Sequence, residues 1–264
     1  MQAGKFKVLI KVFSFWVLWL SMLHFTGALQ GFFPQVLISC IYGILGSIYA
    51  FLLTWIYLHF EKKSFRDIGL VWQLKTPLRF FYGVLIGAAI FATITFLLLI
   101  FGRLHLTRTN ISPANILISA ITLFWLALME EVAFRSYPFL KLKNNFGLWG
   151  AQFIAAIAFA SYHFAIGWPL QSVLIGPFVW AFVYGLAAVW SRGIALPAGL
   201  HMMLNIGQTL TGMTSTSSAI WKIDFNNPTH SNLQPILILI HAFILFVTLI
   251  LTGYFIKKSI AKVV

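Results

Sequence analysis

The sequence predicts an all-α, polytopic transmembrane bundle of about eight spans, with both termini in the cytoplasm. Three observations predict it: 60% of the 264 residues are hydrophobic, only 9% are charged, and the mean hydropathy is +0.91. A soluble domain carries about a quarter charged residues. A helix needs roughly 20 mostly apolar residues to cross the hydrocarbon layer. We therefore expect a single membrane domain over residues 1–264, without a sizeable soluble part.

Each expected helix corresponds to one apolar segment of the chain. An isolated strand cannot satisfy its backbone in lipid, and these segments lack the alternating polar face of a barrel strand, so we expect helices. The first follows three lysines and is longer than the apolar region of a signal peptide, which favours a retained span. The segments cover residues 8–29, 35–59, 80–102, 114–140, 147–166, 172–190, 194–213 and 234–257.

The basic residues predict the orientation of the bundle. Cytoplasmic loops of membrane proteins are enriched in Lys and Arg. With the N-terminus inside, fourteen of the 18 basic residues fall on the cytoplasmic side and three outside, while Arg135 lies within a helix. Basic loops beside anionic lipid also account for the net charge of +13, so we expect no nucleic-acid partner. The expected location is a membrane, and the short, simple chain favours a prokaryotic inner membrane.

Two of the five carboxylates stand out because they lie inside an apolar segment. Glu130 and Glu131 are adjacent in the fourth segment, and Arg135 follows. Ionisable residues within the membrane are costly, and they are usually paired and functional. Glu131 and Arg135 are four residues apart, which favours a salt bridge on one helix face. Glu130 lies about 100° round the helix, so it is available as a general base.

Two further segments carry polar residues at helical spacing. Phe159 and His163 are four apart on the fifth segment, and His201 and Asn205 are four apart on the seventh. Pro197 precedes the second pair and should weaken that helix locally, because proline cannot donate a backbone hydrogen bond. A single buried histidine is more often a packing residue than a catalyst. A carboxylate, two histidines and an asparagine on three helices favour an active site instead.

Three motifs of this chain resemble the CPBP family, the CAAX proteases and bacteriocin-processing enzymes. Residues Glu130 to Arg135 match EExxxR, Phe159 to His163 match FxxxH, and His201 to Asn205 match HxxxN. The motifs occur in the family's order on successive core helices, and the resemblance covers about residues 65–210. It implies a glutamate-dependent intramembrane endopeptidase that cleaves a membrane-associated or lipidated protein or peptide.

The resemblance also implies a role for each motif residue. Glu130 and His163 would activate a water molecule, and His201 and Asn205 would donate hydrogen bonds to the oxyanion. Glu131 and Arg135 would hold the cavity in shape, and Phe159 would pack against the site. Peptide hydrolysis needs a base, an acid and stabilisation of the tetrahedral anion, and these residues can supply all three without a cofactor.

Three alternatives remain open. Zinc bound by Glu130, His163 and His201 is chemically conceivable, since two histidines and a carboxylate bind zinc in some metalloproteases, but HExxH is absent and Glu130 would be lost as a base. A non-catalytic immunity factor or regulatory partner would have the same motifs. A transporter could use the cluster as a proton relay, although no inverted repeat is visible. The identity of the substrate is left open by the sequence.

Overall fold

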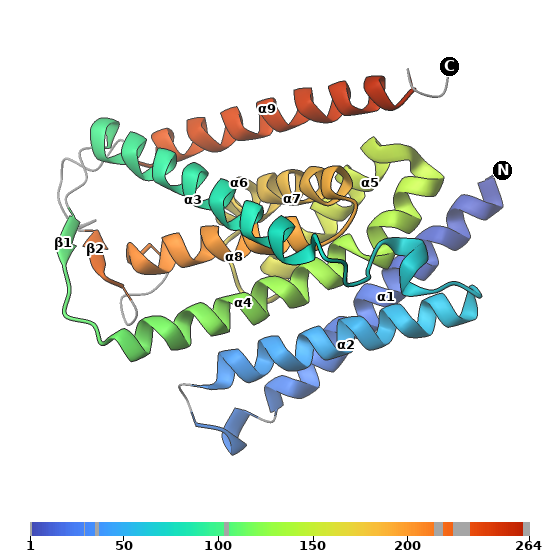
Figure 1. Ribbon diagram of the computed structural model, residues 1–264, viewed down its shortest axis with the longest axis horizontal. Coiled ribbons are helices and arrows are strands. Elements are labelled where there is room, and N and C mark those ends of the chain that lie inside the picture. The colour runs from blue at the N-terminus through green and yellow to red at the C-terminus, as the bar shows by residue number, and fades with distance from the viewer. Residues whose placement is uncertain are drawn as a thin grey trace.

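The computed structural model describes residues 2–28, 30–34, 37–102, 106–213, 219–223 and 233–260. The chain forms an elongated bundle whose helices run roughly along one axis (Figure 1). The described α-helices are α1 (Gln2–Ala28), α2 (Ile38–Phe60), α3 (Thr76–Phe101), α4 (Pro113–Arg135), α5 (Tyr137–Ala165), α6 (Leu170–Ile175), α7 (Pro177–Ser191), α8 (Ala195–Leu210) and α9 (Leu233–Ile260). Short 3-10 helices are η1 (Gln30–Phe32) and η3 (Phe65–Ile68), and the strands are β1 (Leu106–Arg108) and β2 (Trp221–Ile223).

The helical membrane bundle that the sequence predicts is confirmed. Six helical stretches of the described chain are long and apolar enough to cross a membrane, so the protein is an integral membrane protein. One of them, Pro113–Ala165, contains both α4 and α5, whereas α8 is only 16 residues long. The start of α1 and the end of α9 lie at the same end of the bundle (Figure 1). The count of eight spans and the cytoplasmic termini stay predictions.

The expected single helix over 114–140 is wrong, because α4 ends at Arg135. Ser136 has a non-helical backbone, with φ −89° and ψ −118°, and α5 starts at Tyr137. Pro138 explains the break, since it has no N–H to donate to the Phe134 carbonyl and is tolerated only in a first helical turn. Glu130 and Arg135 therefore lie near the end of a helix that packs in the interior of the bundle.

Two other predicted segments are also interrupted. The expected helix 172–190 is divided at Gly176 and Pro177 into α6 and α7. Within α5, Gly147 adopts φ +73°, a left-handed conformation that glycine tolerates best, so the helix is kinked there. Pro197 lies in the first turn of α8, where backbone N–H groups have no helical partner, so the expected weakening around His201 does not occur.

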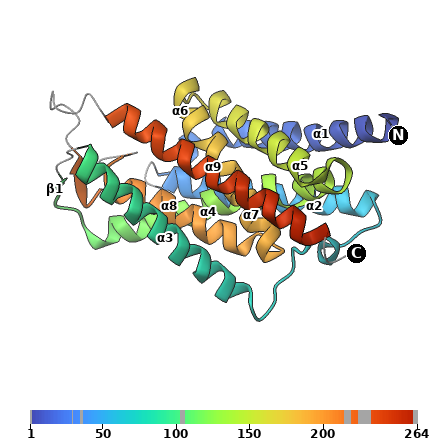
Figure 2. The ribbon, with the colours of Figure 1, turned by 90° about the horizontal axis from the view of Figure 1, so that it is seen from above.

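Helix α4 lies at the centre of the bundle, between α2 on one side and α8 on the other (Figure 1). Helix α3 packs on α8, α5 packs on α7, and α9 lies obliquely across α7 (Figure 2). Two indole N–H groups of α1 donate hydrogen bonds to backbone carbonyls of α4 and α2. Trp16 donates to the Ala133 carbonyl at 3.1 Å, and Trp19 donates to the Gly46 carbonyl at 3.0 Å.

The contact between α3 and α8 depends on glycine. A Cβ atom at Gly83 would overlap the Leu196 carbonyl oxygen, and one at Gly199 would overlap the Phe80 carbonyl oxygen. Small residues let two helix backbones approach closely in membrane proteins. These glycines therefore position α8, the helix that carries His201 and Asn205.

At the end of the bundle opposite the termini, β1 and β2 form an antiparallel pair (Figure 1). Leu106 pairs with Ile223 and Arg108 with Trp221. The pair links the segment after α3 to the segment after α8. Sequence analysis predicts no strand here, and residues 214–218 and 224–232 lie outside the described residues.

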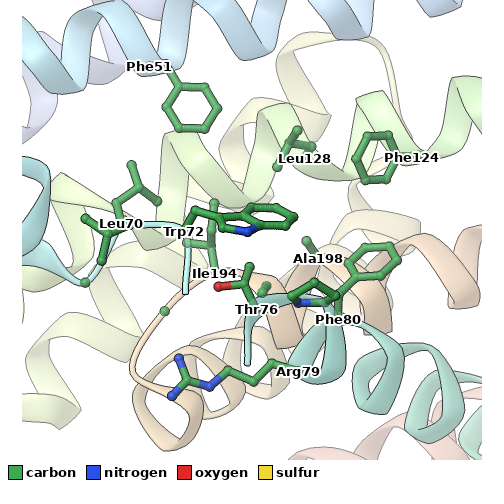
Figure 3. Close-up of a pocket in the computed structure, with 15 residues that line it drawn as sticks. Phe51, Leu70, Trp72, Thr76, Arg79, Phe80, Phe124, Leu128, Ile194 and Ala198 are labelled. Carbon is green, nitrogen blue, oxygen red and sulfur yellow. The ribbon is translucent and has the colours of Figure 1, made fainter. Parts of the chain in front are cut away.

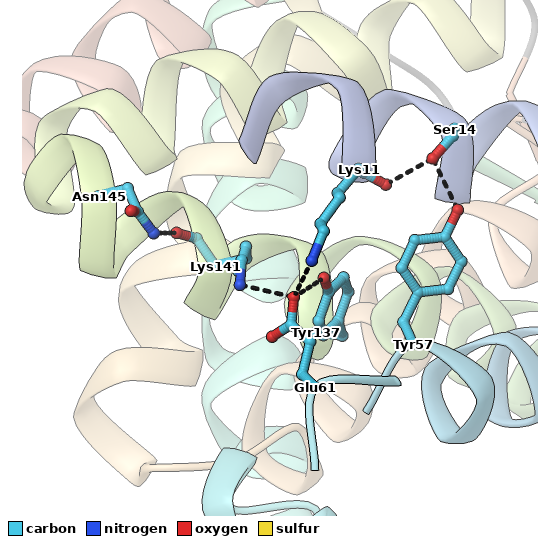
Figure 4. Close-up of polar contacts among 7 residues, drawn as sticks. All are labelled: Lys11, Ser14, Tyr57, Glu61, Tyr137, Lys141 and Asn145. Atoms are coloured by element: carbon cyan, nitrogen blue, oxygen red, sulfur yellow. Dashed lines mark hydrogen bonds and ion pairs between the residues drawn. The ribbon is translucent and has the colours of Figure 1, made fainter. Parts of the chain in front are cut away.

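At the end of α2, Glu61 joins three helices (Figure 4). Its Oε1 accepts hydrogen bonds from Lys141 at 2.6 Å, Tyr137 at 2.9 Å and Lys11 at 3.0 Å. Burial alone would raise the pKa of Glu61, but these hydrogen bonds outweigh it and lower the pKa to about 2. We call Glu61, Lys11, Tyr137 and Lys141 the Glu61 cluster. It connects α1, α2 and α5.

Candidate active site

The last turns of α4 bring three ionisable side chains into the interior of the bundle. Glu131 and Arg135 are fully buried at their side chains, and the Glu130 side chain is 11% exposed. Unpaired charges in such a place would be strongly destabilising. The partners of these three groups therefore decide what each of them can do.

Glu131 is the residue with two charged neighbours. Its Oε2 lies 3.6 Å from Arg135 Nε, so the ion pair predicted from their spacing is confirmed. Its Oε1 lies 2.9 Å from His201 Nδ1 on α8. The second contact is not predicted from the sequence, because it joins residues 70 positions apart. Glu131 is thus a link between the two helices as well as a partner of Arg135.

The contact with Glu131 determines how His201 presents its other nitrogen. A carboxylate can only accept a hydrogen bond, so Nδ1 of His201 carries a hydrogen and donates it to Glu131. This leaves Nε2 facing Glu130, whose Oε2 lies 3.7 Å away. At this separation the two groups are not hydrogen-bonded to each other, but both can contact one water molecule or substrate group between them.

Glu130 and Glu131 differ in what lies beside their Oε2 atoms. Oε2 of Glu131 also has no hydrogen bond among the described residues, but it lies 3.6 Å from Arg135 Nε. Within the described residues, the buried Oε2 of Glu130 has no hydrogen-bond partner. Buried polar atoms in native proteins are nearly always paired, so such an atom calls for an explanation. A water molecule or a substrate group between Glu130 and His201 would satisfy it.

His163 on α5 has its orientation set by its own helix. Its Nδ1 lies 2.9 Å from the Phe159 carbonyl oxygen, which can only accept, so Nδ1 carries a hydrogen. In the neutral ring, Nε2 is then the free acceptor. Aromatic rings surround the imidazole, with centroids 4.6 Å away for Phe159, 4.9 Å for Tyr162 and 5.1 Å for Trp168.

Phe159 connects the polar groups of the site. Its ring lies 4.3 Å from the Arg135 guanidinium carbon and 6.2 Å from the His201 ring centroid, in addition to its contact with His163. A guanidinium over an aromatic face is attracted by the ring quadrupole. The Phe159 ring therefore packs against Arg135, His163 and His201.

Tyr184 on α7 is a neighbour of the site that sequence reasoning missed. Its ring stacks on His201 with centroids 4.3 Å apart and an interplanar angle of 17°, and it lies 5.2 Å from the Arg135 guanidinium carbon. Its sequence surroundings resemble other aromatic stretches of the chain, so no local signal marks it. The Tyr184 ring covers one face of the His201 ring and thereby restricts the orientation of its plane.

Asn205 is the remaining motif residue, and a metal site is the remaining alternative. Asn205 is half-buried on α8, one turn after His201, as its spacing predicts. Among the described residues, no group of three or more His, Cys, Asp and Glu side chains could hold a metal ion.

Comparison with known families matches the part of the chain that carries all three motifs. Residues 112–207 match the family model described as type II CAAX prenyl endopeptidase Rce1-like. The predicted resemblance to CAAX-type proteases is therefore confirmed for α4 to α8. The match supports intramembrane endopeptidase activity in general. None of the curated proteins matches the sequence.

Proposed function

We propose that this chain is an intramembrane endopeptidase in which Glu130 and His163 activate a water molecule for attack on a peptide bond. The observation that carries the proposal is the buried Oε2 of Glu130, which has no hydrogen-bond partner among the described residues and lies 3.7 Å from His201 Nε2. A carboxylate oxygen without a hydrogen bond can accept one from water and take its proton.

Glu130 removes a proton from the water, and the water oxygen bonds to the carbonyl carbon of the substrate. The Nε2 of neutral His163 accepts the second hydrogen of the water and holds the water in place. The C–N bond then breaks, and the proton held by Glu130 passes to the leaving nitrogen, which departs as an amine. The water oxygen remains in the new carboxyl group, so atoms and protons balance.

His201 and Asn205 donate hydrogen bonds to the oxyanion of the tetrahedral intermediate. Because Nδ1 of His201 already donates to Glu131, a donation from Nε2 requires the imidazolium form. In that form Nδ1 keeps its contact with the Glu131 carboxylate, at 2.9 Å. Each donor of this kind typically contributes a factor of 10² to 10³ to the rate.

Every step is assigned to a side chain or to water, so the reaction needs no metal or other cofactor. The substrate is a membrane-associated or lipidated protein or peptide, because the site lies inside a membrane bundle. Both termini lie in the cytoplasm in this proposal, on the basis of the basic loops. A prokaryotic inner membrane is the proposed location.

The proposal is tested by comparing membrane-protein fragments from cells that contain the wild type, Glu130→Ala or Asp67→Asn. New N-termini are identified by mass spectrometry. We expect a set of fragments with the wild type that persists with Asp67→Asn, an exposed loop carboxylate, and disappears with Glu130→Ala. Identical fragments in all three strains would favour the non-catalytic membrane partner instead.

A further inference from the structure

A cavity of about 460 Å³ lies next to the segment that joins α2 and α3 (Figure 3). Its walls come from α2, from the segment between α2 and α3, from the start of α3, from α4, and from the start of α8 with the residues just before it. The volume lies in the range of sites that hold small organic ligands. Neither the proposed reaction nor the family match assigns it a role.

The lining of this cavity is almost entirely hydrocarbon. Phe51 of α2, Phe124 and Leu128 of α4, and Ala198 of α8 form the deep part. Phe51 lies nine residues before the end of α2, which is about 14 Å along the helix. The cavity therefore extends from the loop at the end of two membrane-spanning helices toward the apolar layer.

Arg79 is the one charged residue among the described residues that line the cavity. In Figure 3 its guanidinium points away from the rings of Phe51 and Phe124. Its Nη1 donates to Gln73 Oε1 at 3.2 Å, which uses one of its five N–H groups. A planar guanidinium can bind two oxygens of a phosphate at once.

The chain around Arg79 is basic as well. Lys75 and Arg192 are exposed and directly precede the lining residues Thr76 and Gly193. The acidic residue of this loop, Asp67, is already bonded, since its Oδ2 accepts from Ser64 N at 2.7 Å and from Ser64 Oγ at 2.8 Å. The entrance to the cavity therefore favours an anion.

We infer that this cavity binds one anionic phospholipid, with an acyl chain against Phe51, Phe124 and Leu128 and the phosphate on Arg79. The apolar walls offer few partners for the N–H and C=O groups of a peptide, whose burial without hydrogen bonds is costly. An acyl chain needs none. Basic pockets between membrane helices are known to attract lipid headgroups.

The experiment uses the purified full chain in an uncharged detergent, with equal amounts of phosphatidylglycerol and phosphatidylcholine. Native mass spectrometry counts the bound lipids. We expect one retained phosphatidylglycerol, preferred about fivefold over phosphatidylcholine, because one arginine near a headgroup has an effect of that size. Arg79→Gln should remove the preference. Arg66→Gln is the matched control, since Arg66 is exposed on the same loop and does not line the cavity.

A phosphatidylglycerol with a photoreactive group in its acyl chain locates the bound chain. Cross-links should form at Phe51, Phe124 or Leu128. Equal binding of both lipids, equal effects of the two arginine substitutions, or cross-links mainly at the exposed Phe243 and Phe246 of α9 would overturn the inference. Displacement of the lipid by an acylated peptide at equal concentration would also overturn it. Glu130→Gln should leave lipid binding unchanged, so this result is independent of proteolysis.

Discussion

Two glutamates of this chain have nearly the same burial but different surroundings. The Glu61 side chain is 9% exposed, and its Oε1 accepts three hydrogen bonds from Lys11, Tyr137 and Lys141. The Glu130 side chain is 11% exposed, and its Oε2 has no hydrogen-bond partner among the described residues. The two carboxylates therefore differ in their supply of hydrogen-bond donors rather than in their burial.

The hydrogen-bond donors near Glu130 face the adjacent residue, Glu131, instead. Arg135 and Nδ1 of His201 both face Glu131, at 3.6 Å and 2.9 Å. Glu131 thereby corresponds to Glu61, as a carboxylate that connects helices. Glu130 is left as the carboxylate that a water molecule or a substrate can reach. The comparison predicts that the three glutamates respond differently to the same Glu-to-Gln substitution.

The largest effect on stability is expected for Glu131→Gln. The substitution leaves Arg135 as a buried charge without a charged partner, which typically costs 3–5 kcal/mol of unfolding free energy. Thermal unfolding in detergent measures the loss. Glu130→Gln is the matched control and should melt close to the wild type, since its neighbour His201 keeps the contact with Glu131. Equal destabilisation by both substitutions would contradict the assignment of Glu131.

Glu61→Gln should have a smaller effect on stability, about 2 kcal/mol, because its hydrogen bonds involve charged groups near the surface. Its pKa is lowered from 4.5 to about 2, so its stabilisation is fully present above pH 4.5 and is lost as the pH falls toward 2. The melting temperatures of the wild type and Glu61→Gln should therefore converge on acidification. A constant difference across this pH range would argue against the Glu61 cluster as the source.

Removal of the ring that stacks on His201 should affect the rate rather than stability. Tyr184→Leu is expected to lower kcat about fivefold with little change in KM, because an aromatic stack contributes about 1 kcal/mol. Tyr184→Phe retains the ring and should stay near the wild-type rate. If both variants lose the same activity, the hydroxyl group rather than the stack is responsible.

The smallest effect is expected for metal removal. Exhaustive chelation should leave peptide cleavage unchanged, because the proposed steps involve only side chains and water. Glu130 is then needed as a base and not as a ligand. Loss of activity that zinc restores would identify Glu130, His163 and His201 as ligands. Glu130 would then be a bound carboxylate like Glu61, and not a base.

The sequence predicted the contacts that depend on helical spacing. The pair Glu131 and Arg135 follows from an i,i+4 relation, and so does the shared position of His201 and Asn205 on α8. The break of α4 could also have been predicted, since Pro138 is visible in the sequence and cannot continue a helix. The catalytic roles of these residues stay predictions.

The remaining contacts depend on long-range packing, which helical periodicity does not contain. The bond from His201 to Glu131 spans 70 positions, and those from Tyr137 and Lys141 to Glu61 span 76 and 80. The stack of Tyr184 on His201 and the cavity beside Arg79 require the same three-dimensional information. A chain with 27 phenylalanines and 10 tryptophans offers too many aromatic residues for sequence reasoning to select one.

The central claim is that the unpaired carboxylate of Glu130 activates water, and the most direct test is the cleavage rate of Glu130→Gln. The purified variant is compared with the wild type and Glu61→Gln in lipid vesicles, on a substrate identified from the cellular fragments. We predict at least a hundredfold loss for Glu130→Gln at an unchanged melting temperature, since a general base contributes 10² to 10⁴. Glu61→Gln should keep its rate per folded molecule. A Glu130→Gln variant that cleaves at the wild-type rate would contradict the account.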